Sequence, residues 1–230
     1  DALWDCLPEG RKLGGAPANF AYYMMLFGFD SLAVSAIGND ELGAEIKETF
    51  DKAGLKYMLQ VTEYPTGTVT VDIDERGIPS YDIKENVAYD YMSYTPELEE
   101  VAKKCNVACF GSMTQRNPVS RKTIRKFLES MPQTVETYKV FDINLRQHFY
   151  DKEIISESLR LCNVFKINDE DTEELMCEGG TLQARADRDS TTIKYSGRTI
   201  ATYSVNKTRY NAYIFLIRII ADNLDKPVVG

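Results

Sequence analysis

Short apolar runs alternate with segments of helical spacing along most of the chain. The predicted strands are 2–7, 31–38, 106–111, 138–146 and 163–168, and the predicted helices are 16–27, 40–53, 96–104, 118–131, 151–161 and 169–177. Strands separated by single helices run parallel in one sheet, with the helices packed against it. The pattern therefore predicts an α/β fold, a doubly wound, mostly parallel sheet with helices on both faces.

Two of the predicted helices have distinct signals. Asp40 has the position of an N-cap for the helix 40–53, and Gly54 has the position of its stop. The helix 16–27 is apolar and aromatic along almost its whole length, which predicts a buried helix.

The period changes to two in the middle of the chain. The stretch "TGTVTVDID" alternates in this way, and "GIPSYDIKENVAY" follows it after a turn, with no helix between them. We interpret residues 57–92 as a small antiparallel β lid, and residues 1–56 with 93–230 as the α/β core. After Gly180 the pattern is weaker and predicts two strands near 191–204 and a final helix near 211–224.

Composition and charge narrow the class of protein. A length of 230 residues suits one domain with a small appendage, and a net charge of -8 argues against nucleic-acid or membrane binding as the main task. The odd number of cysteines, 5, and the single His148 fit neither a zinc site nor a disulfide framework. No apolar run reaches the roughly 20 residues that span a bilayer. We expect a reduced, cytoplasmic protein.

Candidate chemistry is sought at the carboxyl ends of the parallel strands, where open α/β sheets bind ligands. Asp5 ends the first predicted strand, and a carboxylate accepts two hydroxyl hydrogen bonds at once, which suits a sugar. Taken alone, Asp5 is better explained as a surface acid or a loop cap.

The stretch "LGGAPAN" is the second candidate. Gly14 and Gly15 allow close approach to the main chain, Pro17 suits a first helical turn, and Asn19 lies in that turn. The alternative is a tight turn that leads into a core helix.

The stretch "DINLR" is the third candidate. On a strand, Asp142, Asn144 and Arg146 point the same way, and Arg146 could hold an anion. The alternative is an internal Asp–Arg ion pair that braces a loop.

Two further polar groups follow strands. Asn168 and Asp171 in "KINDED" open the next predicted helix, where a phosphate or hydrated Mg²⁺ would lie. The alternative is capping of that helix by Asn168 or Asp169, which the pattern alone favours. Gln115 and Arg116 in "GSMTQR" follow the strand 106–111, with an exposed loop as the alternative.

Together these residues resemble the PfkB (ribokinase-like) carbohydrate kinases, most closely the bacterial fructokinase branch. The positions of the family's first signature are all met, by Gly14, Gly15, Pro17, Asn19, Ala21, Gly28 and Gly38. The blocks "LWDCLPEG", "AIGNDELG", "YPTGTVTVDID", "FGSMTQR", "FDINLR" and "KINDED" are similar to those of the branch and come in the same order. The resemblance covers roughly residues 2–177.

The resemblance implies a ribokinase-like fold and a carbohydrate kinase, a phosphotransferase with an alcohol group as acceptor. It implies ATP and Mg²⁺ as cofactors and fructose as the first choice of substrate. The residues it assigns to substrate binding are Asp5, Gly14, Gly15, Asn19, Arg116 and Arg146. It assigns Asn168 and Asp171 to the nucleotide, phosphate and Mg²⁺, with no direct metal ligand; the family normally has Glu where Asp171 stands.

The chain departs from the family in its last quarter. The Gly-Ala-Gly-Asp loop that supplies the catalytic base is not found, and Asp222, within the predicted final helix, is no substitute. The base is therefore unassigned, and a non-catalytic sugar- or nucleotide-binding relative is the alternative. A kinase for another ketose or for a sugar acid such as 2-keto-3-deoxygluconate is a second alternative.

Two other inferences concern class and assembly. A nicotinamide-dependent oxidoreductase is weakly supported, because no G-x-G-x-x-G follows the first strand. A lid made of strands has an open edge, through which two copies could pair as a homodimer.

Overall fold

The structure is a computed structural model that describes residues 1–73, 79–167 and 171, together with the later strands 182–187, 190–195, 198–204 and 215–218. The chain divides into two compact units. Unit 1 consists of residues 1–95 with 117–124, and unit 2 consists of residues 96–116 with 125–230.

The core of unit 1 lies around a pair of parallel strands, β3 (Leu32–Gly38) and β4 (Lys56–Thr62). Helices α1 (Ala16–Leu26) and α2 (Glu41–Ala53) pack on β3. Small and large apolar side chains of β3, α1 and α2 pack with residues of the N-terminal segment and of the α2–β4 connection in one cluster, made by Ala2, Trp4, Ala18, Ala21, Ala33, Ile37, Ile46, Phe50 and Leu55. This cluster fixes the two helices on the strand pair.

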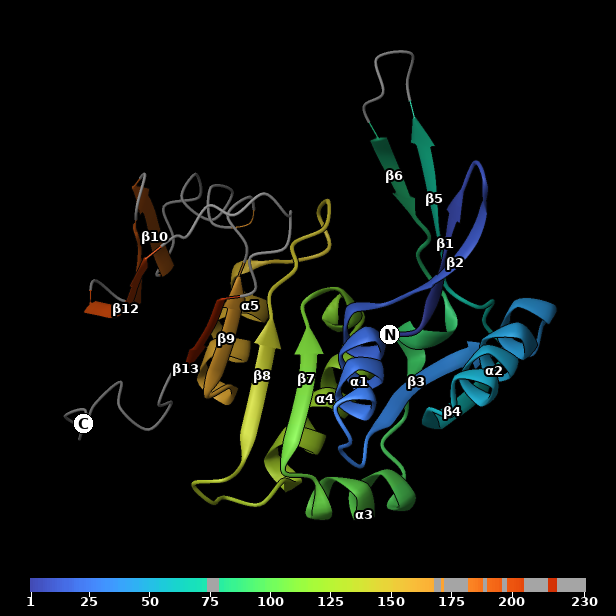
Figure 1. Ribbon diagram of the computed structural model, residues 1–230, viewed down its shortest axis with the longest axis horizontal. Coiled ribbons are helices and arrows are strands. Elements are labelled where there is room, and N and C mark those ends of the chain that lie inside the picture. The colour runs from blue at the N-terminus through green and yellow to red at the C-terminus, as the bar shows by residue number, and fades with distance from the viewer. Residues whose placement is uncertain are drawn as a thin grey trace. The chain divides into compact units, whose positions relative to one another are not determined.

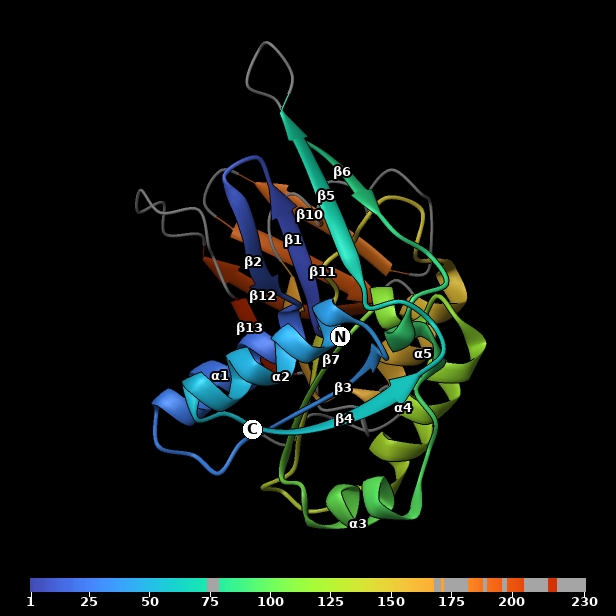
Figure 2. The ribbon, with the colours of Figure 1, turned by 90° about the vertical axis from the view of Figure 1, so that its right-hand side faces the viewer.

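A second sheet of unit 1 has the order β2-β1-β5-β6 and extends away from β3 and β4 (Figures 1 and 2). Its strands are β1 (Leu3–Leu7), β2 (Gly10–Gly14), β5 (Thr68–Ile73) and β6 (Pro79–Ile83). The pairs β1–β2 and β5–β6 are antiparallel hairpins, and β1 joins β5 in parallel.

This arrangement corrects part of the predicted lid. The antiparallel pair expected within 57–92 is present as β5 and β6, but residues 56–62 pair in parallel with β3. The apolar side chains of β4 are suited to a strand beside β3, and the period-two pattern begins only at β5. The division into a core and a lid that closes stays a prediction.

Unit 2 contains three parallel strands in the order β9-β8-β7, with β13 (Phe215–Arg218) antiparallel to β9. The parallel strands are β7 (Val107–Gly111), β8 (Tyr138–Asp142) and β9 (Val164–Ile167). Phe110, Phe141 and Phe165 stack across them, with ring centroids 5.3 Å and 5.8 Å apart. The helices of unit 2 are α3 (Pro96–Lys104) and α5 (Lys152–Leu161), with α5 against β8. Helix α4 (Pro118–Ser130) belongs to unit 1 up to Ile124 and to unit 2 from Arg125.

Local capping signals predicted the helix ends well. The Asp40 carboxylate accepts a hydrogen bond from the Gly43 N–H at 2.8 Å, and Gly54 ends α2 with φ +71°. The same chemistry begins α5, where the Asp151 carboxylate accepts from the Ile154 N–H at 2.7 Å. These contacts confirm the predicted N-cap and stop of α2.

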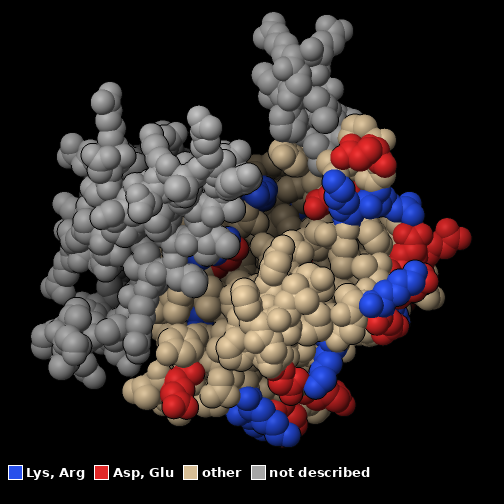
Figure 3. All heavy atoms as spheres, in the orientation of Figure 1, with Lys and Arg blue, Asp and Glu red and all other residues tan. Residues whose placement is uncertain are grey.

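Helix α1 is not the buried helix that the sequence predicted. Its buried residues are Ala18 and Ala21, whereas Tyr23 is 59% exposed and Phe27, just beyond its end, is 77% exposed. Figure 3 shows the area over α1 without charged side chains, while acidic and basic side chains gather over α2. Apolar residues occupy every face of α1, so the periodicity of the sequence could not show which face is buried. The structure shows that this face is the one with the small side chains of Ala18 and Ala21.

The weakly patterned end of the chain is partly as predicted. Strands β11 (Ser190–Tyr195) and β12 (Arg198–Ser204) confirm the two strands expected near 191–204, and β10 (Leu182–Asp187) pairs antiparallel with β11. The helix predicted near 211–224 is wrong at 215–218, which form strand β13. A short apolar run fits a buried strand or a helix equally well, and pairing with the edge of β9 decides it. The helix predicted at 169–177 lies, apart from Asp171, outside the described residues.

Two 3-10 helices complete the described part, η1 (Ala88–Tyr91) and η2 (Met113–Gln115). No helix among the described residues is long and apolar enough to cross a lipid bilayer.

The substitution Gly54→Ala tests the predicted stop of α2. No atom lies within 4 Å of the added Cβ, so the cost comes only from the positive φ. We expect a loss of about 1 kcal/mol in the free energy of unfolding, measured by urea denaturation. Gly54→Asn is the control and should lose less, because Asn tolerates this backbone region; equal losses for the two variants would contradict this explanation.

Candidate functional site

Asp5 lies in the middle of β1, and its neighbours across the sheet are Lys12 on β2 and Val69 on β5. The sequence placed Asp5 at the carboxyl end of a strand in the main parallel sheet, and that placement is wrong. The reason is the turn at Pro8–Gly10, after which the chain folds back as β2. Asp5 is half-buried, and its carboxylate lies on the sheet that contains the predicted lid strands.

The paired glycines leave room for two different groups. A Cβ on Gly14 would lie 2.3 Å from Oδ2 of Asp5, so a side chain at this position would displace the carboxylate. Gly15 has φ +108°, and a Cβ there would lie 2.5 Å from the carbonyl oxygen of Asp1. The predicted close approach to the Gly14-Gly15 main chain is therefore real, and the group that approaches Gly14 is the Asp5 carboxylate.

Asn19 follows the glycines in the first turn of α1. Its backbone N–H donates to the Gly15 carbonyl at 2.9 Å, which is the first bond of the helical ladder, and its side chain is exposed. Pro17 lies in the same turn, as predicted. Gly14 and Gly15 thus link the Asp5 carboxylate to the start of the helix that carries Asn19.

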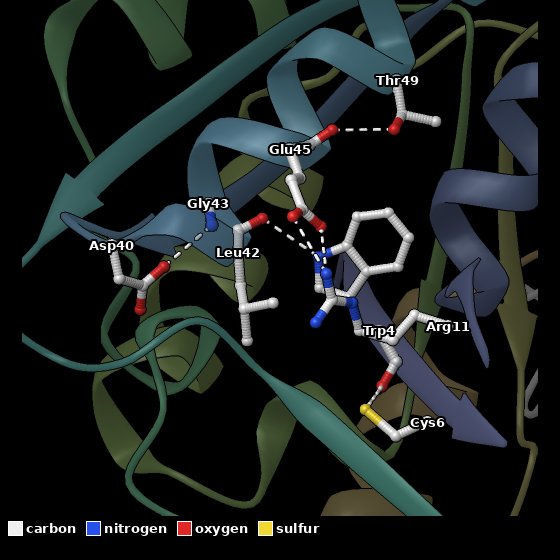
Figure 4. Close-up of polar contacts among 8 residues, drawn as sticks. All are labelled: Trp4, Cys6, Arg11, Asp40, Leu42, Gly43, Glu45 and Thr49. Atoms are coloured by element: carbon white, nitrogen blue, oxygen red, sulfur yellow. Dashed lines mark hydrogen bonds and ion pairs between the residues drawn. The ribbon is translucent and has the colours of Figure 1, made fainter. Parts of the chain in front are cut away.

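The first two turns of α2 hold β1 and β2 in place (Figure 4). The indole N–H of Trp4 donates to the Leu42 carbonyl at 3.0 Å. The Arg11 guanidinium donates to both carboxylate oxygens of Glu45 at 2.9 Å and lies 5.9 Å from the Trp4 ring centroid. Our sequence analysis missed these residues, although the turn "LPEG" between two short alternating stretches is a hairpin signal.

In unit 2, β8 ends at Asp142 and the chain then leaves the strand geometry. Asn144 and Gln147 have positive φ values of 37° and 48°. The predicted alternation through 146, with Asp142, Asn144 and Arg146 on one face, is therefore wrong beyond Asp142. The buried carboxylate of Asp142 pairs with the Lys166 ammonium on β9 at 2.5 Å, so its partner is a lysine and not the arginine considered in the alternative.

Three predicted residues contact the segment 143–149. The Leu145 N–H donates to Oδ1 of Asp171 at 3.2 Å, and Asp171 is 4% exposed. The Arg146 guanidinium, which is exposed, donates to the Leu145 carbonyl at 2.7 Å. The Arg116 guanidinium lies 4.4 Å from the Phe149 ring centroid. Unit 2 thus brings Arg116, Arg146 and Asp171 to one short segment, and Asn168 lies outside the described residues.

Other polar candidates in this unit have structural roles. The Gln115 amide donates to the Gly111 carbonyl at 2.8 Å and to the Ser158 hydroxyl at 2.9 Å, which ties η2 to α5.

Burial raises the pKa of Cys162 to about 12. The pKa of Cys109 is also raised to about 12, mainly by burial and to a smaller extent by the Asp142 charge. These two thiols therefore stay protonated near neutral pH and are poor nucleophiles.

Comparison with known proteins decides the family. The family model described as pfkB family carbohydrate kinase matches residues 10–195. The chain belongs to this family. The chain is 27% identical over 183 residues to a fructokinase of Salmonella typhimurium, and 27% identical over 188 residues to one of Escherichia coli. Each match covers 74% of this chain and 59% of the relative, so the chain spans less than two thirds of the length of these curated relatives.

Solved structures of sugar kinases share the fold of this pfkB family chain. An uncharacterized sugar kinase of Pyrococcus horikoshii superposes with a TM-score of 0.70 at 23% identity, covering 93% of this chain and 76% of the other. A fructokinase of Xylella fastidiosa gives a TM-score of 0.71 at 17% identity, covering 93% and 75%. The predicted ribokinase-like α/β fold is therefore confirmed.

The substitution Gly14→Ala tests the contact between Asp5 and the main chain. The added Cβ collides with the carboxylate, so we expect a loss of about 1–3 kcal/mol in the free energy of unfolding. Gly111→Ala is the matched control, because a Cβ there would meet its nearest atom at an ordinary 3.4 Å and should cost little.

Removing the carboxylate should relieve part of this loss. The double variant Asp5→Ala/Gly14→Ala is expected to lose less stability than the sum of its single variants, measured by denaturant unfolding. Strict additivity would show that the carboxylate is not what excludes a side chain at position 14.

Proposed function

We propose that the protein phosphorylates a sugar hydroxyl with ATP, and that fructose is the substrate. The observation that carries this proposal is the Asp5 carboxylate lying against the bare main chain of Gly14, in a chain of the pfkB family of carbohydrate kinases. Sugars offer adjacent hydroxyls, and a carboxylate can accept hydrogen bonds from two of them.

Asp5, Gly14, Gly15 and Asn19 would bind the sugar. The Asp5 carboxylate accepts hydrogen bonds from two hydroxyls, and the exposed Asn19 amide offers both a donor and an acceptor. The absence of side chains at Gly14 and Gly15 lets the Asp5 carboxylate and the Asp1 carbonyl lie against the main chain, which holds the carboxylate in place. Such a set of short, rigidly held groups orients one hydroxyl toward the phosphate donor, which is the larger part of catalysis in phosphoryl transfer.

Arg116, Arg146 and Asp171 of unit 2, with Asn168, would act on the phosphate side. The guanidinium groups of Arg116 and Arg146 match the geometry of phosphate oxygens, and Arg146 is exposed. When bound, Mg²⁺ neutralises negative charge on the phosphates. The Asp171 carboxylate supplies an oxygen of the kind Mg²⁺ prefers.

The relatives support this choice of substrates. A fructokinase of Vibrio cholerae has been solved with fructose, ADP and a calcium ion bound, and the Pyrococcus horikoshii kinase with ATP. The curated relatives at 27% identity include several named fructokinase. The competing candidates are another ketose, a sugar acid such as 2-keto-3-deoxygluconate, and a relative that binds sugar or nucleotide without catalysis.

Three sequence-based expectations accompany the proposal. The catalytic base has no candidate among the described residues. A homodimer formed through the edge of the predicted lid and a cytoplasmic location stay predictions.

The decisive assay measures sugar-dependent release of ADP over a panel of fructose, other ketoses and sugar acids. We expect fructose to stimulate ADP release above the ATP-only rate. Sugar binding without ADP release, measured by titration of the fluorescence of the single tryptophan, Trp4, would favour the non-catalytic relative. If the protein neither binds nor phosphorylates any sugar of the panel, the proposal is overturned.

The substitution Asp5→Asn tests the role of the carboxylate. It keeps the shape of the side chain and removes the charge, so the fold should persist while the dissociation constant for sugar rises about ten- to a hundredfold. Asp30→Asn is the matched control, because Asp30 pairs with Lys56 on the surface at 2.7 Å and touches no candidate residue. An unchanged sugar affinity in Asp5→Asn would show that Asp5 does not bind the sugar.

A further inference from the structure

A closed set of hydrogen bonds lies in unit 1 at the root of β5. Oδ1 of Asp40 accepts from the Gly43 N–H at 2.8 Å and from the Thr66 hydroxyl at 2.6 Å, and Oδ2 accepts from the Thr66 N–H at 2.8 Å. The Thr66 hydroxyl in turn accepts from the Gly38 N–H at 2.9 Å. We call Gly38, Asp40, Gly43 and Thr66 the Asp40–Thr66 brace.

The brace is tightly packed, because its other atoms occupy the positions where side chains at Gly38 and Gly43 would lie. A Cβ on Gly38 would lie 2.4 Å from Oδ2 of Asp40 and 2.7 Å from the Thr66 nitrogen. A Cβ on Gly43 would lie 2.5 Å from the Gly38 carbonyl oxygen and 2.9 Å from the Thr66 hydroxyl. Thr66 itself is 3% exposed. The end of β3, the start of α2 and the approach to β5 are thus held in one arrangement.

The brace does more than cap a helix. Asp151 caps α5 by accepting from the Ile154 N–H, whereas Asp40 caps α2 and also accepts two bonds from Thr66, 26 positions along the chain. Burial alone would raise the pKa of Asp40, but the bonds from Thr66 and Gly43 outweigh it and hold this pKa below its ordinary value. Asp40 is therefore ionised at neutral pH, and its bonds to Thr66 are charge-assisted.

Thr66 lies directly before the backbone that supports Asp5. The next residue, Gly67, accepts a hydrogen bond from the Trp4 N–H at 3.0 Å, and a Cβ on Gly67 would lie 2.4 Å from the ring of the buried Tyr89. In the register of β1 and β5, Trp4 faces Thr68 and Asp5 faces Val69. The position of Thr66 therefore fixes where β5 begins. The register between β5 and β1 then fixes the position of Asp5 along the sheet.

We propose that Asp40 and Thr66 are positioning residues for the sugar, acting through β5 on the Asp5 carboxylate. The inference rests on the proposed function. The same region of α2 also anchors β1 and β2 through the Leu42 carbonyl and Glu45 (Figure 4). Bonds from the start of α2 therefore reach β1 itself and both of its neighbours, β2 and the root of β5. Neither Asp40 nor Thr66 needs to touch the sugar for this role.

The test compares Thr66→Val with Thr66→Ser. Val has the shape of Thr, but its side chain neither donates to Asp40 nor accepts from the Gly38 N–H, and only the backbone N–H of residue 66 still donates to Asp40. Ser keeps the hydroxyl. We expect Thr66→Val to raise the dissociation constant for fructose about tenfold. It should leave the KM for ATP unchanged, and Thr66→Ser should restore wild-type sugar affinity. Sugar binding is followed by Trp4 fluorescence and by the KM for sugar.

Gly54→Ala is the control for a general loss of stability. It weakens α2 at its other end, where nothing touches the brace, and should lower the melting temperature without changing the affinity for sugar. If Gly54→Ala and Thr66→Val, compared at equal loss of melting temperature, weaken sugar binding alike, the role is only structural and the inference is overturned.

A double-mutant cycle separates this inference from the proposed function. If Thr66 acts through Asp5, Thr66→Val should have no further effect on sugar affinity in the Asp5→Ala background. Full additivity would overturn the inference while leaving Asp5 as a sugar-binding residue. If the wild-type protein binds no sugar, both the proposed function and this inference are overturned. If the wild-type protein binds sugar and Thr66→Val binds it with the same affinity, only this inference is overturned.

Discussion

The close approach of the Asp5 carboxylate to Gly14 is the constraint on which the candidate site depends. A carboxylate placed 2.3 Å from where a Cβ would lie tolerates only glycine, and the positive φ of Gly15 demands a second glycine at the next position. The chain can then enter α1 within one residue and place Asn19 in the first turn. The pair of glycines therefore does two separate jobs, one for a side chain across the sheet and one for the turn into the helix.

Sequence reasoning succeeded where the deciding forces are local. The Asp40 cap and the Gly54 stop act within a few residues, and the helices of unit 2 follow from their own periodicity. It failed where partners distant in sequence decide the outcome. Residues 56–62 form a core strand because they pair with the edge of β3. Asp142 pairs with Lys166 on the neighbouring strand and not with Arg146, which is close to it in sequence. The site residues of the first signature were found through the family resemblance more than through their pattern.

The irregular segment after β8 shows why alternation is a poor guide beyond the end of a strand. Positive φ values at Asn144 and Gln147 turn the chain out of the sheet, a conformation that costs free energy for residues other than glycine. The turn lets the Leu145 N–H reach Asp171, and lets the Phe149 N–H reach the Arg146 carbonyl at 3.1 Å. The hydrophobic residues Ile143 and Leu145 are both buried here although they are not on a strand. Burial of these two side chains and the new hydrogen bonds offset the backbone cost.

The same physical logic connects the two sheets of unit 1. The apolar cluster on β3 holds α1 and α2 against the strands. Because apolar contacts are not directional, the cluster alone does not fix the exact position of a polar group. Hydrogen bonds from the first turns of α2 supply that direction, through Asp40 to the root of β5 and through the Leu42 carbonyl to Trp4. Since β1 and β5 share one register, a displacement of the β5–β6 hairpin at its root is carried to Asp5. The predicted lid strands β5 and β6 and the carboxylate proposed to bind sugar are thus parts of a single sheet.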